Sequence, residues 1–232
     1  MAYPDCWHII SYPRSGNHAV RAIVERFSGR PTLGCPGNER DDPPLYLRKK
    51  NQSLNLIKIE DERCIGRKSH SLFDLIRHDA HEENAGLVLI TRDPLDAITS
   101  HIYSLARPRL LKRKVRCDVL VQKAVQEYLA PIFAFRGMHN RKRIYVRYED
   151  FVRPNSGIPA KLLQQMGLND KQSTETEIVE TLSLSFDSLR RPGRMNRDEK
   201  IVAAIKHEIA QRLNYADVMD LIRADASDTF VS

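Results

Sequence analysis

Cysteine is scarce in this sequence, and the few cysteines stand far apart. Four occur in 232 residues, and no two of them form a C-x-x-C pair. Scattered cysteines in a chain of this length are expected to be reduced thiols, as is typical of cytoplasmic proteins. The spacing argues against a zinc site, because structural zinc is usually held by closely spaced cysteine pairs.

Long apolar runs are also missing. No stretch approaches the roughly 20 apolar residues that a membrane-spanning helix needs. Residues 1–5 have neither the basic nor the apolar region of a signal peptide. There is no repeat of about 20 to 50 residues and no low-complexity tract. We therefore expect a cytoplasmic protein without a membrane span.

Hydrophobic and basic residues, by contrast, are well represented. Hydrophobic residues make up 41% of the chain, enough for a sizeable core, and we expect one domain over residues 1–232. The formal net charge is +7, with basic runs at residues 107–116 and 141–143. Such runs are usually solvated surface, but a basic balance also suits nucleic acid or a multiply charged nucleotide. Net charge alone does not separate these ligands.

Strand-like and helix-like segments alternate along the chain. The segments expected to be strands are residues 6–11, 63–70, 86–91 and 144–147. The helices expected between and after them lie around residues 20–27, 72–78, 94–105 and 121–132, and residues 173–232 are expected to be mainly helical. The alternation predicts an α/β fold of three layers, with a central parallel sheet flanked by helices and a helical C-terminal part.

Residues 30–62 are expected to be a loop or an insert. Four prolines and two glycines fall within residues 30–44, which favours a surface loop. In parallel α/β sheets, ligands bind beyond the carboxyl ends of the strands. The segments that matter for function are therefore the joints from strand to helix, at residues 11–17, 67–71, 91–94 and 147–151.

The joint at residues 11–17 has the parts of an anion site. The N-terminus of a helix offers N–H groups without intrahelical acceptors and a partial positive charge. Gly16 allows close backbone approach, Ser15 and Asn17 are short and polar, and Arg14 supplies a fork of donors. The pattern is not a Walker A loop, because Asn17 and His18 occupy the places of its lysine and hydroxyl. Phosphate binding and a plain turn both remain open.

The joint at residues 67–71 places a cation near a base. Lys68 and His70 project to the same side if the segment is extended, because strand side chains alternate. A lone histidine is more often a hydrogen-bonded structural residue than a catalytic one. Both interpretations of His70 stay open on spacing alone.

The joint at residues 91–94 ends a strand and starts a helix. Asp93 is expected to be the N-cap, with Asp96 at the capping-box position. Arg92 at the strand end and Ser100 two turns into the helix are placed to bind a phosphate. The alternative is that Arg92 only pairs with Asp93 or Asp96.

Together these segments resemble the family of sulfotransferases that use 3′-phosphoadenosine 5′-phosphosulfate (PAPS). The family signatures, in chain order, are Y-P-K-S-G-T-x-W, K-[TS]-H, R-[DN]-P-x-D-x-x-x-S-x-x-[YH], R-Y-E-D and a later S-F. They are matched by residues 12–19, 68–70, 92–103, 147–150 and 185–186. The resemblance covers residues 7 to 215 in the right order, and it implies the sulfotransferase variant of the P-loop α/β fold.

The resemblance also implies an activity and roles for residues. It implies in-line transfer of a sulfuryl group from PAPS to a hydroxyl or amine, with His70 as general base and Arg14 and Lys68 neutralising the leaving phosphate. The N–H groups of residues 15–18 would cradle that phosphate, and no metal is expected. The residues assigned to the cofactor are Arg14, Ser15, Gly16, Asn17, His18, Arg92, Ser100, Tyr148, Phe186, Arg190 and Arg191.

The sequence departs from the family pattern in three places. Arg14 replaces a lysine, which keeps the positive charge but exchanges a compact ammonium for a planar guanidinium. Ala19 replaces a tryptophan that stacks on adenine in many relatives, so stacking would rest on Tyr148 and Phe186. The R-K-G-x-x-G-D-W-K segment is degraded at residues 190–194.

Two other function classes stay open beside the sulfotransferase. One is another P-loop transferase or kinase, which would require Mg-ATP; the other is a basic nucleic-acid-binding protein, whose affinity would fall steeply with salt. For a sulfotransferase we expect a small-molecule or glycan acceptor and no nucleic acid. The acceptor would be selected by residues 30–44, residues 107–116 or the C-terminal helices. The oligomeric state is left open.

Overall fold

The computed structural model describes residues 6–35, 64–70, 85–105, 114–168, 174–189, 199–214, 216–218 and 220. Within them the chain forms a five-stranded sheet with the order β2-β3-β1-β4-β5, and every neighbouring pair is parallel. The strands are β1 (Trp7–Ser11), β2 (Thr32–Leu33), β3 (Gly66–Ser69), β4 (Gly86–Thr91) and β5 (Arg143–Arg147). The expected parallel α/β sheet is confirmed.

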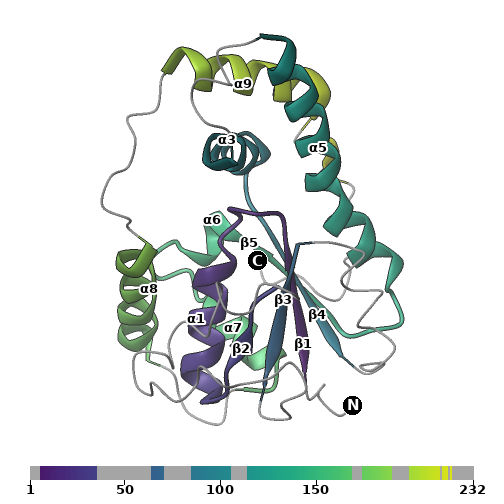
Figure 1. The fold of residues 1–232 in the computed structure, drawn as a ribbon. Coiled ribbons are helices and arrows are strands. Elements are labelled where there is room, and N and C mark those ends of the chain that lie inside the picture. The colour runs from purple at the N-terminus through teal and green to yellow at the C-terminus, as the bar shows by residue number, and fades with distance from the viewer. Residues whose placement is uncertain are drawn as a thin grey trace.

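Helices cover both faces of this sheet (Figure 1). They are α1 (Asn17–Ser28), α3 (Pro94–Leu105), α5 (Lys114–Gly137), α6 (Tyr148–Phe151), α7 (Ile158–Gln165), α8 (Glu175–Leu189) and α9 (Glu199–Arg212). Neighbouring residues of β1 point to opposite faces. Ile9 packs in a core with residues of α1, α7 and α8, whereas Ile10 packs in a second core with residues of α3, α5 and α9.

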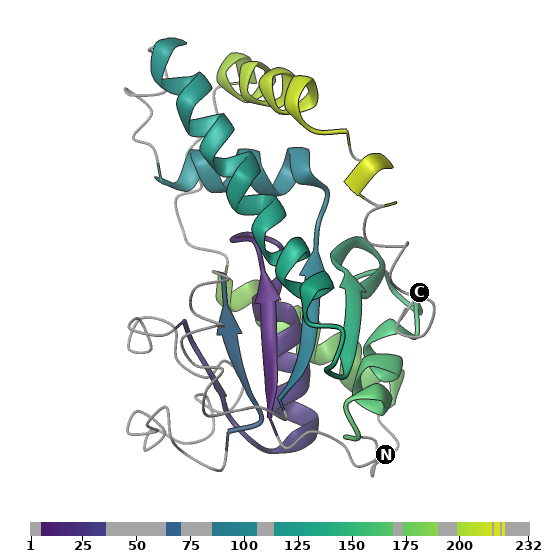
Figure 2. The same cartoon turned by 90° about the vertical axis from the view of Figure 1, so that its right-hand side faces the viewer.

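The helices of the second core extend past the sheet. Figure 2 shows the strands running toward α3 and α9, which lie beyond their carboxyl ends. Ile205 and Ile209 of α9 are fully buried in the same core as Ala97 and Ile98 of α3. The C-terminal part of the chain therefore returns to the edge of the sheet where ligands bind in α/β proteins. Among the described residues, no helix combines the length and the hydropathy of a membrane-spanning segment.

One expectation from the sequence is wrong in part. Residues 32–33, inside the segment expected to be a loop, form the buried edge strand β2. Thr32 is held by two fully buried side chains of α1, because Arg21 Nε donates to Thr32 Oγ1 at 2.8 Å and Glu25 accepts from the hydroxyl and backbone N–H of Thr32. This anchor is polar, so an apolar pattern does not reveal it. Residues 36–62 and the helix expected at 72–78 lie outside the described residues.

Candidate functional site

The strand order brings the four predicted joints to one edge of the sheet. β1 lies between β3 and β4, and β5 follows β4. The loop after β1 is therefore flanked by His70, which follows β3, and by Arg92, which follows β4. Tyr148 follows β5 at the same edge. Because all strands are parallel, residues far apart in sequence surround the start of α1.

The loop after β1 is a tight turn with two left-handed residues. The N–H of Ser15 donates to the carbonyl of Tyr12 at 3.2 Å, and φ is 71° at Arg14 and 92° at Gly16. A Cβ added at Gly16 would lie 1.9 Å from the ring of Tyr148, so only glycine fits there. The expected cradle is corrected in one detail, since the N–H of Ser15 is used within the turn.

The hydroxyl of Ser15 is a buried polar group without a described hydrogen bond. The side chain is fully buried, and its Oγ has no hydrogen-bond partner within the described part of the chain. Gly16, the N-cap of α1, provides no side-chain cap, and the helix begins at Asn17. The loop thus combines a buried polar oxygen with the positive end of a helix.

Two arginines and a serine meet beside the loop. Arg14 Nε donates to Ser100 Oγ at 3.3 Å, and Arg92 Nη1 donates to the carbonyl of Arg14 at 3.3 Å. The guanidinium of Arg92 also lies 5.2 Å from the centroid of the Tyr148 ring. Arg14 and Arg92 are 78 positions apart in the chain, and Arg14 and Ser100 are 86 positions apart. The fold brings them together at this edge, as expected from the positions of the joints.

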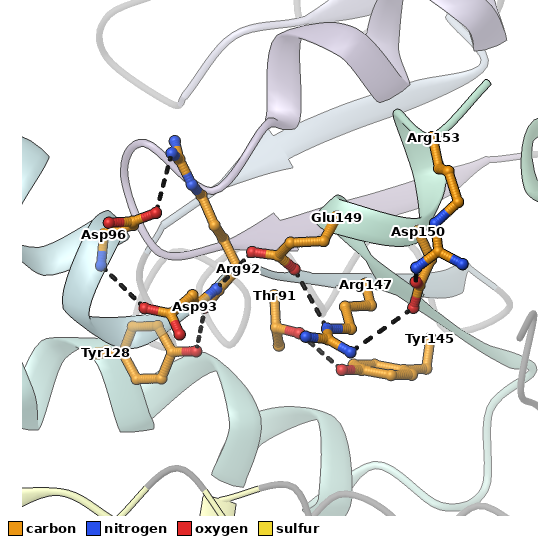
Figure 3. Close-up of polar contacts among 10 residues, drawn as sticks. All are labelled: Thr91, Arg92, Asp93, Asp96, Tyr128, Tyr145, Arg147, Glu149, Asp150 and Arg153. Atoms are coloured by element: carbon orange, nitrogen blue, oxygen red, sulfur yellow. Dashed lines mark hydrogen bonds and ion pairs between the residues drawn. The ribbon is translucent and has the colours of Figure 1, made fainter.

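Arg92 also pairs with Asp96, which was one of the two partners considered from the sequence. Arg92 Nη2 lies 3.8 Å from Asp96 Oδ2 (Figure 3). The other carboxylate oxygen accepts a hydrogen bond from Lys206 Nζ of α9 at 3.1 Å. Sequence reasoning missed Lys206, since nothing local to residues 199–212 points to a site 110 positions away.

His70 is oriented by the neighbouring strand. Its Nδ1 donates to the carbonyl oxygen of Ser11, because a carbonyl only accepts. In the neutral ring the basic nitrogen is then Nε2. Ser11 Oγ accepts from Asn17 Nδ2 at 3.1 Å, so Ser11 also joins this strand end to α1. Lys68 lies on β3 with 7% of its surface exposed.

A pair that the sequence analysis did not single out stands behind the loop. Tyr12 Oη and His101 Nδ1 are 2.7 Å apart, with the two rings edge to face. Burial, with a smaller contribution from the Arg14 charge, lowers the pKa of His101 to about 4. Burial, assisted by Glu127, raises the pKa of Tyr12 above its usual range. Both side chains are therefore neutral at pH 7.

The R-Y-E-D segment holds the residue that follows Arg92 (Figure 3). Glu149 Oε1 accepts the backbone N–H of Asp93 at 2.8 Å, and Glu149 Oε2 accepts from Arg147 Nε at 3.3 Å. The N-cap prediction is confirmed, since the N–H of Asp96 donates to Asp93 Oδ1 at 3.1 Å. The capping-box role expected of Asp96 is wrong, because Glu149 takes the N–H of Asp93.

The remaining predicted site residues are only partly described. The ring of Tyr148 packs on Gly16, and burial raises the pKa of its phenol. His18 is half-buried at the start of α1. Phe186 lies on α8 and its side chain is outside the described part, as are Arg190 and Arg191. Within the described ranges, no group of three or more His, Cys, Asp or Glu is placed to hold a metal ion.

Comparisons with known proteins find structural likeness only. No family model matches the sequence, and no curated protein matches it. Two solved structures of retinol dehydratase, one with androsterone and the inactive cofactor PAP and one with retinol and PAP, are similar over 99% of this chain. Each is 14% identical in sequence to this protein. The matched regions make up 82% and 83% of the retinol dehydratase chains, with TM-scores of 0.49 and 0.48. At such values the function has to be judged from the site itself.

Proposed function

We propose that this protein is a PAPS-dependent sulfotransferase, which transfers the sulfuryl group of PAPS to a hydroxyl or amine of an acceptor. The observation that carries the proposal is the buried Ser15 hydroxyl without a hydrogen-bond partner in the described chain, at the start of α1. Leaving such a group unsatisfied costs free energy, so a ligand that accepts its hydrogen bond would be favoured. The helix N-terminus and Arg14 beside it favour an anionic ligand.

The residues around the loop fit the two phosphate groups of the co-substrate. In the proposal, Ser15, Gly16, Asn17 and His18 bind the 5′-phosphate end. Arg92 and Ser100, which both contact Arg14, hold the 3′-phosphate. Tyr148 forms one wall for the adenine, together with Phe186, and Arg190 and Arg191 complete the cofactor site.

His70 acts as the general base of the proposed reaction. When bound, PAPS supplies an activated sulfuryl group joined to a phosphate that can leave. Nε2 of His70 accepts the proton of the acceptor group, because Nδ1 is held as a donor by Ser11. Arg14 and Lys68 stabilise the negative charge that the phosphate oxygen gains as its bond to sulfur breaks. The acceptor is a small molecule or a glycan, and the reaction needs no metal.

Ligand binding and transfer together test the proposal. Thermal shifts would be measured with 3′-phosphoadenosine 5′-phosphate (PAP), AMP, ADP and Mg-ATP, since a ligand that binds only the folded state raises the melting temperature. We expect the largest rise in melting temperature with PAP. In a second assay, with a panel of hydroxyl and amine acceptors, we expect transfer of the radiolabelled sulfuryl group from PAPS to continue in the presence of EDTA.

Removal of the Arg92 charge tests the 3′-phosphate site by comparing the binding of PAP with that of AMP. Arg92→Ala is expected to weaken PAP binding about tenfold to a hundredfold and AMP binding much less, because it removes a charge-assisted contact to the 3′-phosphate. Arg153→Ala removes an exposed arginine that pairs with Asp150 and serves as the control. Protection by Mg-ATP with turnover that EDTA abolishes would instead support a kinase. Salt-sensitive binding of nucleic acid, with no change in melting temperature on adding any of the nucleotides, would support a nucleic-acid-binding protein.

A further inference from the structure

Asp96 places a negative charge in the middle of the proposed phosphate-binding face. Asp96 and Ser100 are four residues apart on α3 and so lie on one side of the helix, and Arg92 precedes the helix by two residues. Half of the Asp96 side chain is exposed, and one of its oxygens lies 3.8 Å from Arg92. This carboxylate would hold the guanidinium of Arg92 and repel a phosphate arriving there.

Lys206 offsets this charge from a different helix. Its Nζ donates to Asp96 Oδ1 at 3.1 Å, whereas Arg92 lies near Oδ2 of the same carboxylate. Arg92 and Asp96 by themselves carry no net charge, and Lys206 makes the group positive again. The sharing of one carboxylate between two cations also weakens the hold of Asp96 on Arg92.

The position of Lys206 follows from the packing of α9. Ile205 and Ile209, which flank it on the helix, are fully buried in the core that α9 shares with α3. Ile98 of α3 belongs to the same core. The backbone next to Lys206 is therefore held against α3, although 43% of the lysine side chain is exposed.

We propose that Lys206 is a positioning residue of the 3′-phosphate subsite. It holds the carboxylate of Asp96 and so leaves the guanidinium of Arg92 available to a 3′-phosphate. The inference rests on the proposed function, because it needs a ligand that carries a 3′-phosphate. It assigns to α9 a part in selecting PAPS over nucleotides with a 5′-phosphate only.

A double-mutant cycle at Lys206 and Asp96 tests the inference. Dissociation constants for PAP and AMP would be measured by calorimetry for the parent, Lys206→Ala, Asp96→Asn and the double variant. We expect Lys206→Ala to weaken PAP about twofold to tenfold, a modest loss because both charges are partly exposed, and to leave AMP unchanged. Asp96→Asn in the Lys206→Ala background should restore PAP affinity to that of the parent. Lys206→Arg should bind PAP like the parent, and the loss should shrink at high salt.

Arg212→Ala provides the matched control. It removes a positive charge from the same helix, and the carboxylate paired with Arg212 is Glu208 of α9 itself. We expect it to leave the ratio of PAP to AMP affinity unchanged.

The outcomes separate this inference from the proposed function. If the parent prefers PAP but Lys206→Ala keeps the full preference, the inference is wrong and the proposed function stands. If the double variant binds PAP as weakly as Lys206→Ala, the effect does not pass through Asp96 and the inference is also wrong. If the parent binds PAP no better than AMP, the 3′-phosphate subsite itself is wrong, and both proposals fall.

Discussion

His70 is the side chain on which the proposed transfer step most depends. A general base contributes about 10²–10⁴-fold to the chemical step and little to cofactor binding. We therefore expect His70→Ala and His70→Gln to lose transfer by that factor while the dissociation constant of PAP stays near that of the parent, and the melting temperature falls by no more than the loss of the hydrogen bond to Ser11 explains. The measurements are single-turnover rates across pH and calorimetry with PAP. A histidine that is only structural would instead lower the melting temperature and leave the transfer rate largely intact.

Ser15 allows the anion loop to be tested without any acceptor. Its hydroxyl is buried without a described partner, so Ser15→Ala removes a group that makes no hydrogen bond to the described residues. We expect the free energy of unfolding to be equal to or higher than that of the parent, because a desolvated hydroxyl is gone. The rise in melting temperature with PAP should fall. A variant that is less stable without ligand but keeps the full PAP shift would contradict the assignment of the loop.

At the scale of elements, Glu149 joins the start of α3 to the end of β5. Its carboxylate accepts the N–H of Asp93, which no residue of α3 satisfies in the described contacts. We expect Glu149→Ala to lower the free energy of unfolding by about 1 kcal/mol, the usual effect of losing a helix cap or one hydrogen bond. Urea unfolding measures it.

Glu149→Gln separates the hydrogen bond from the charge. The amide oxygen can still accept the N–H of Asp93, while the charge that pairs with Arg147 is lost. We expect most of the stability to return, because ion pairs that are partly exposed contribute little. Equal stability of Glu149→Ala and the parent would show that the connection between β5 and α3 does not depend on this side chain.

At the scale of the whole molecule, His101 makes stability depend on pH. Its pKa is about 4 in the folded protein, against the ordinary histidine value of 6.5. Between these values the unfolded chain binds a proton that the folded chain does not, so folding stability rises with pH and is lost as pH falls from 6.5 toward 4. His101→Gln removes this proton uptake. Free energies of unfolding between pH 4 and 7.5 should therefore rise less steeply with pH in the variant, and a slope equal to that of the parent would contradict the prediction.

Much of the fold was predictable from local patterns. The apolar run at residues 86–91 became β4 with the same bounds, and the strand, turn and glycine at residues 6–16 became β1 and the start of α1. These features are set by neighbours in the chain, through side-chain alternation, capping and the φ that only glycine adopts readily. Parallel strands then require their carboxyl ends to meet, so the joints that form the candidate site were also within reach of the sequence.

Other parts of the site depended on contacts that no local pattern encodes. Glu149 reaches Asp93 across 56 positions, and Lys206 reaches Asp96 across 110. The strand β2 was missed because its anchor is the polar pair Arg21 and Glu25 rather than an apolar stripe.

The parallel α/β class, the edge of the sheet that carries the loop and the residue types gathered there thus follow from local sequence patterns. Three features follow instead from packing across the sheet: which nitrogen of His70 is a donor, the neutral pair of Tyr12 and His101, and the approach of Lys206 on α9 to Asp96. Alternation and helical periodicity specify which face of an element is buried. The partner of a charged or buried polar group is chosen by how helices pack across the sheet, and that packing sets the distances on which charge, pKa and ligand selection depend.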